Sequence, residues 1–124
     1  MIPLLARVDK VNQPKPNSLR ITGSVDIRNV ELHNVQTRQS GNLRTGAVEI
    51  YIFQQDLRGG VLDQVRDKLR LQLTNENYAA YLRSGVLFRE YIQPKSGLTT
   101  LRVLIGDPNS GAIGSLIVPV KQIR

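Results

Sequence analysis

The chain has 124 residues with no cysteine and one histidine, and 17 Lys and Arg against 10 Asp and Glu give a formal net charge of +7. This length suits one domain with its own core, and the lack of cysteine excludes disulfides, thiolate zinc sites and cysteine nucleophiles. No apolar run approaches the roughly 20 residues of a membrane-spanning helix, and the first ten residues lack the basic start of a signal peptide.

Residues 1–18 combine a short apolar strip, 2–8, with the polar segment NQPKPNS at 12–18. Two prolines keep that segment out of a central strand. The strip is therefore either a first edge strand or the remnant of a linker to an upstream domain. Residues 19–124 are predicted to form a single β-sandwich domain.

The next segments alternate between apolar and polar residues, which is the pattern of a half-buried strand. In 19–27 the apolar residues are Leu19, Ile21, Val25 and Ile27, and 30–36 continues the pattern more weakly. The segment TRQSGNLRTG, 37–46, is predicted to be a long, mobile polar loop. In 47–56 both faces carry apolar residues, which predicts a central strand.

Gly59 and Gly60 predict a turn over 56–60, because glycine adopts positive φ without steric cost. A short edge strand is expected at 61–66 and a second strand at 68–74. The alternation of apolar and polar residues then ends, and a short helix is predicted near 75–83, capped by Thr74 or Asn75 and ended by Gly85. Its face of Tyr78, Tyr81 and Leu82 is expected to pack in the core.

A strand at 86–93 and a turn at 94–97 follow, and 98–107 is expected to pair with 112–120. Pro119 confines the last strand to an edge or to positions that need no donor. Seven or eight strands and one short helix predict an all-β, immunoglobulin- or fibronectin-III-like antiparallel sandwich. A small barrel of the OB type is the alternative.

The segment DPNSG, 107–111, looks most like a catalytic site, because Asp107, Asn109 and Ser110 lie between two apolar runs. Each residue also has a turn role: Asp107 accepts from backbone amides, Pro108 presets φ, and Gly111 takes the left-handed position. No G-x-S-x-G motif is present, and the lone His33 is expected at the surface. We therefore predict a turn, and no catalytic, cofactor-binding or metal-binding residue and no enzyme.

The positive charge comes mainly from twelve arginines spread along the chain, which is typical of solvated strand faces and disfavours nucleic acid as a partner. Single-strand binders need aromatic platforms beside a positive groove, and aromatics make up only 5% of the residues. A basic nucleic-acid- or polyanion-binding domain remains the alternative function. Carbohydrate binding is a weaker one, for which Tyr51 and Phe53 are the only same-face aromatic neighbours.

A resemblance to a known family is carried by three segments: GAVEIYIFQQDLRGG at 46–60, LRLQLTNENYAAYLRSGVLFREYIQPKSG at 69–97 and LTTLRVLIGDPNSGAIGSLIVPV at 98–120. They resemble the C-terminal domain of bacterial, acidobacterial-type VWFA-related domain proteins. The resemblance implies a non-enzymatic accessory sandwich in an exported, extracytoplasmic protein, with an upstream von Willebrand A-type domain as its protein partner. We expect a monomer or weak oligomer, since Pro119 and the arginines discourage edge pairing.

Overall fold

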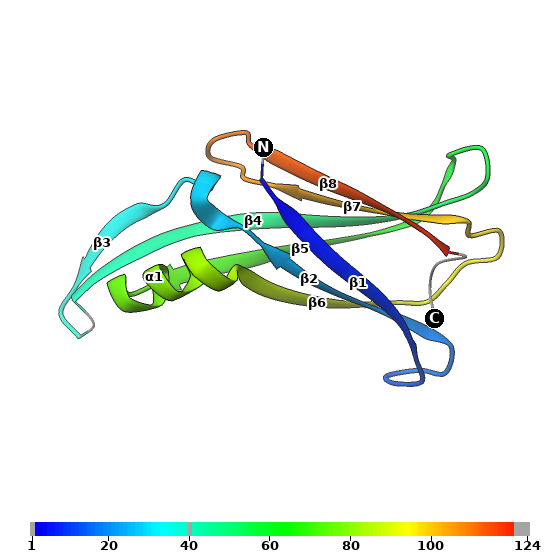
Figure 1. Cartoon of the computed structure of the whole chain (residues 1–124), viewed down its shortest axis with the longest axis horizontal. Coiled ribbons are helices and arrows are strands. Elements are labelled where there is room, and N and C mark those ends of the chain that lie inside the picture. The colour runs from blue at the N-terminus through cyan, green and yellow to red at the C-terminus, as the bar shows by residue number, and fades with distance from the viewer. Residues whose placement is uncertain (1, 40, 121–124) are drawn as a thin grey trace.

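The computed structural model describes residues 2–39 and 41–120, and it shows two antiparallel sheets packed face to face (Figure 1). Sheet A has the order β1-β2-β6, with β1 at Leu4–Val11, β2 at Ser18–Val25 and β6 at Val86–Ile92. Sheet B contains β3 (His33–Thr37), β4 (Gly41–Gln55), β5 (Val61–Leu73), β7 (Thr100–Gly106) and β8 (Ile113–Pro119). The all-β sandwich predicted from the sequence is confirmed.

Strand β4 is the central strand of sheet B, as its two apolar faces predicted. It pairs with β5 along one side and with β3 and then β7 along the other, and β8 follows β7 at the edge. The orders β1-β2-β6 and β5-β4-β7-β8 match the A-B-E and C′-C-F-G sheets of immunoglobulin-like sandwiches. Pro119 ends β8, which is an edge strand as expected.

The core lies between the sheets and is built from every second residue of their strands. Leu19, Ile21 and Val25 of β2 face Val48, Ile50 and Ile52 of β4, and the exposed fraction of each is 5% or less. Each buried aliphatic side chain contributes about 1.5–3 kcal/mol of transfer free energy, so this layer is the main source of stability. The other buried apolar residues are Ile2, Val8, Ile27, Val30, Leu71, Leu73, Val86, Phe88, Ile92, Leu101, Val103 and Ile105.

Two predictions for sheet B are wrong. Residues 61–73 form one strand rather than two, because β5 follows β4 along nearly its whole length. The expected loop at 37–46 is instead a hairpin, in which β4 begins at Gly41 and Thr37 pairs with Gly41. The polar composition of this segment suggested a loop, but backbone pairing with β3 and β5 makes it a strand.

Helix α1 spans Asn75–Ser84 and connects an edge of sheet B to an edge of sheet A (Figure 1). Its start is capped as predicted, since Thr74 Oγ1 accepts from Asn77 N at 3.1 Å, and Gly85 ends it with φ of 76°. Tyr78 and Leu82 pack against the core, and the Arg44 guanidinium lies 4.1 Å from the Tyr78 ring centre. Tyr81, expected in the core, is 37% exposed, because the contact stripe follows Tyr78 and Leu82.

The two sides of the sandwich close in different ways. On one side Ile2 N donates to Ile113 O at 2.8 Å, so the chain two residues before β1 is bonded to the start of β8. On the other side the edge strands β5 and β6 are linked by α1. There Asp67 of β5 and Glu90 of β6, both on the core side of their strands, form a carboxyl–carboxyl hydrogen bond.

Candidate functional site on the outer face of sheet B

The segment 107–111 is a turn, as predicted, and Asp107 is buried in it, with only 2% of its surface accessible. Its carboxylate accepts from Asn109 N at 3.0 Å and from Ser110 Oγ at 2.7 Å, and Gly111 takes a φ of 78°. It also accepts from Glu31 N at 2.7 Å, from the segment between β2 and β3. Burial alone would raise the pKa of Asp107, but these hydrogen bonds lower it. Asp107 therefore links the turn between β7 and β8 to the segment between β2 and β3.

His33 lies elsewhere, exposed at the start of β3, where its backbone carbonyl accepts from Thr45 Oγ1. Within the described part of the chain, no hydrogen bond joins His33 to Asp107 or Ser110. Asp107 and Ser110 are thus engaged in bonds of the turn, and these hydrogen bonds do not bring His33 to them. Nor do residues 2–39 and 41–120 contain a group of three or more His, Asp or Glu placed to hold a metal ion.

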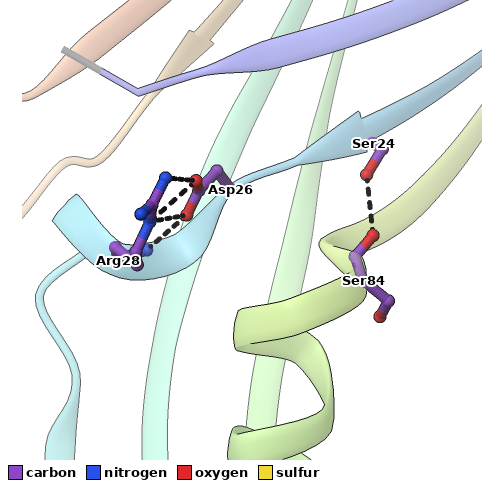
Figure 2. A network of polar contacts seen from close by, with 4 residues as sticks. All are labelled: Ser24, Asp26, Arg28 and Ser84. Atoms are coloured by element: carbon purple, nitrogen blue, oxygen red, sulfur yellow. Dashed lines mark hydrogen bonds and ion pairs between the residues drawn. The ribbon is translucent and has the colours of Figure 1, made fainter.

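Two further polar contacts lie near the end of β2, one at the short 3-10 helix that follows it and one beside the end of α1 (Figure 2). Arg28 Nε donates to both carboxylate oxygens of Asp26, at 3.0 and 2.9 Å, and Ser24 Oγ donates to Ser84 O at 3.3 Å. Asp26 also caps the short 3-10 helix Ile27–Asn29 through Arg28 N, and this arginine lowers the pKa of Asp26. An open hollow of about 340 Å³ lies beside these contacts, and Ser24 and Asp26 form part of its lining. These contacts stabilise the junction of β2 with the short 3-10 helix and with the end of α1.

The outer face of sheet B gathers aromatic and basic side chains that lie far apart in the sequence. The strand register places Arg66 and Leu104 on either side of Tyr51, and Gln64 and Arg102 on either side of Phe53. We call this surface the Tyr51 face. It comprises Glu49, Tyr51 and Phe53 of β4, Arg66, Lys68 and Arg70 of β5, Arg102 and Leu104 of β7, and Ile113 and Ile117 of β8.

Two aromatic rings form the centre of the Tyr51 face. Tyr51 and Phe53 are both partly buried, and their ring planes are parallel to within 3° with centroids 6.3 Å apart. The Arg66 guanidinium lies 5.5 Å from the Tyr51 centroid, within the range of a cation–π contact. Ile113 and Ile117, beyond β7, are 57% and 60% exposed. The face therefore offers flat apolar area with cations beside it.

Charge on the Tyr51 face is predominantly positive. Glu49 is its one carboxylate; it accepts from Arg66 at 3.0 Å and from the Tyr51 hydroxyl. The tyrosine bond, with help from Arg66, lowers the pKa of Glu49, and the same bond raises the pKa of Tyr51. Among the described residues, neither Arg70 nor Arg102 has an ion-pair partner. Their charges remain available to a ligand.

Side chains alternate between the two faces of β5, and this alternation places its basic and acidic residues on opposite faces. Arg66, Lys68 and Arg70 share the outer face, whereas Asp63 and Asp67 point to the opposite side of the same strand. Asp63 there approaches Lys95 at 3.8 Å, and Asp67 bonds to Glu90. A segment with mixed charges in sequence thus has a purely basic outer face. Sequence spacing alone could have shown this if 61–73 had been read as one strand.

The outer face of sheet A also carries arginines, but their charges are partly neutralised. Asp9 accepts from Arg7 at 3.1 Å and from Arg20 at 3.4 Å. Arg89 lies in the row of Arg7 and Thr22, next to the row that contains Tyr91. This face has a single aromatic residue among its paired strands and no stacked pair. It provides a natural control for experiments on the Tyr51 face.

No family model, curated protein or solved structure matches this chain. In the described residues, no helix has both the length and the apolar character needed to cross a bilayer. The site must therefore be interpreted from its geometry. That geometry brings Tyr51 and Phe53, singled out earlier as same-face neighbours, into one surface with arginines that looked scattered in the sequence.

Proposed function

We propose that the chain is a non-enzymatic interaction module that binds an anionic partner through the Tyr51 face. The observation that carries the proposal is the sorting of charge on sheet B. Four cationic side chains, from Arg66, Lys68, Arg70 and Arg102, share this face with the single carboxylate of Glu49. Complementary charge steers encounter and favours a partner of opposite sign.

Rigid support of the face agrees with a binding role. Its central strand, β4, is paired on both sides, and the opposite side of that strand is packed in the core through Val48, Ile50 and Ile52. Side chains presented by a paired sheet lose little backbone entropy when they bind, because the backbone is already ordered. A binding surface on β4 and its neighbours is thus preorganised.

Binding of a fluorescein-labelled heparin oligosaccharide, measured by anisotropy at low salt, tests the proposal. The double variant Arg70→Glu/Arg102→Glu should weaken binding by at least about tenfold, and the affinity of the unmodified chain should fall steeply with salt. The matched variant Arg7→Glu/Arg89→Glu changes the net charge equally on sheet A and should have a much smaller effect. No binding at low salt, or equal effects of both variants, contradicts the proposed face.

The non-enzymatic part of the proposal has a separate test. The purified chain is incubated with ester, peptide and glycoside substrates, and the expected rate equals the buffer background. Hydrolysis above background that survives repeated purification would contradict it. The variant Ser110→Ala would then show whether the 107–111 turn is responsible.

A second candidate follows from the resemblance to VWFA-related proteins: we also propose a C-terminal accessory module of an exported, extracytoplasmic protein, docked against its upstream von Willebrand A-type domain. The observation that favours it is a pair of leucines on sheet A. Leu5 and Leu87 are 76% and 70% exposed and flank Ser24 in one row, close to where an upstream domain would join β1. In the parent protein, β1 and β6 should exchange amide hydrogens more slowly than in this chain alone; equal exchange contradicts docking.

A further inference from the structure

We infer that the anionic partner of the Tyr51 face is single-stranded nucleic acid, whose bases stack on Tyr51 and Phe53 while its phosphates contact the cations beside them. This inference rests on the proposed function and specifies its ligand. Two observations carry it: the parallel aromatic pair at the centre of the face, and the cations on both sides of that pair, a row that begins at Arg66 on β5 and Arg102 alone on β7.

The aromatic pair provides a stacking platform. Tyr51 and Phe53 are two residues apart on one strand, so both rings project from the same face, and their planes are parallel to within 3°. Successive bases of a flexible single strand can lie on such rings, since every base has a flat π surface. Heparin and acidic peptides made of carboxylates have no aromatic bases that could stack on these rings.

The cations flank the platform on both sides. Arg66 lies across from Tyr51 on β5, and Arg102 lies across from Phe53 on β7. Lys68 and Arg70 extend the β5 flank at intervals of two residues, or about 7 Å for each step along a strand. Because Lys68 and Arg70 lie opposite Glu49 and Ala47, this row continues past the Tyr51 end of the aromatic pair. A phosphate backbone that runs along β5 meets three cations in turn, and the bases nearest Arg66 turn inward over the rings.

Single strands are favoured over duplexes because the platform needs free base faces. In a duplex the bases are stacked on one another, and a protein reaches only their edges in the grooves. The Tyr51 face is a sheet surface with two parallel aromatic rings, Tyr51 and Phe53, on its central strand. Contact with a duplex would be limited to phosphates and would leave Tyr51 and Phe53 without a role.

The test compares three labelled probes by anisotropy at the same salt concentration: a 12-nucleotide oligothymidine, a duplex of equal length and a heparin oligosaccharide. The variant Tyr51→Leu/Phe53→Leu keeps apolar cover but removes the rings. It should weaken oligothymidine binding by at least about tenfold, as loss of two stacking contacts implies, and change heparin binding by less than about twofold. Tyr91→Leu on sheet A, which removes a 42%-exposed ring, is the matched control and should leave oligothymidine binding unchanged.

Each outcome has one interpretation, provided thermal unfolding shows that the variants are folded. Selective loss of oligothymidine binding supports the inference. If duplex binds as tightly as single strand, or if the leucine variant binds oligothymidine normally, the inference is overturned while an anion-binding Tyr51 face stands. If neither heparin nor oligothymidine binds at low salt, both the inference and the proposed function fail.

Discussion

At the scale of one residue, Gly114 of β8 allows the backbone of Ile2, before β1, to pack closely against β8. A Cβ built at this position would lie 2.0 Å from the backbone oxygen of Ile2, whereas a Cβ at Gly106 would have no neighbour within 4 Å. Gly114→Ala should therefore lower the free energy of unfolding by about 2 kcal/mol or more, as overpacking against backbone does. Gly106→Ala, on the neighbouring strand, should have little effect. Urea unfolding measures both, and equal stabilities would contradict the contact.

Single residues also show what the sequence could and could not reveal. The bonds of Asp107 within its turn were predictable because Asn109 and Ser110 are its near neighbours. Its bond to Glu31 N, 76 residues away, depends on how the strands assemble. Gln54 is a similar case: it is 2% exposed and bonds both Gln93 O and Lys95 N. A buried Gln in an alternating strand gives no local sign of its distant partners.

At the scale of elements, α1 begins at Thr74, one of the two caps that the sequence left open. Thr74 Oγ1 accepts from Asn77 N, one of the amides at a helix start that have no partner within the helix. Thr74→Ala should lower the free energy of unfolding by about 1 kcal/mol, and Thr74→Ser should restore most of it. Ser84→Ala, at the other end of the same helix, should change it by less than about 0.5 kcal/mol. Chemical denaturation of the three variants measures these changes, and a loss at Thr74→Ala no larger than at Ser84→Ala would contradict the cap.

The strands of sheet B explain why the fold was easier to predict than the site. Alternating Leu, Ile and Val residues identify buried faces wherever a strand covers the core, and those elements were confirmed. In β5, Asp63 and Asp67 interrupt the apolar residues of the inner face, so the alternation that marks its continuity from Val61 to Leu73 is broken. The Tyr51 face depends on that continuity and on the register with β4. Arginines that are far apart in the sequence become neighbours only when the strands pair in this register.

At the scale of the whole molecule, the two sheets meet on one side along their edge strands β5 and β6, which α1 links. Asp67 and Glu90 face each other there, Glu90 beside the buried Ile21 of β2. Burial first, and then the hydrogen bond and charge of Asp67, raise the pKa of Glu90 to about 7, whereas the bond from Glu90 lowers the pKa of Asp67. Inward-facing charges on an edge strand also discourage pairing with another chain. The pair therefore joins the sheets only while Glu90 holds a proton.

This arrangement predicts how stability depends on pH. Because the pKa of Glu90 is about 7 in the folded chain and 4.5 is its ordinary value, its contribution is complete below about pH 4.5 and is lost as pH rises through about 7. Glu90→Gln keeps a neutral donor toward Asp67 and removes this titration. Relative to the unmodified chain, it should gain about 1 kcal/mol between pH 5 and pH 8, a value reduced for the partial exposure of Glu90. Denaturant midpoints of both proteins across this range give the difference, in which other titrating groups cancel. A difference that stays constant with pH would show that no proton is shared across the β5–β6 side.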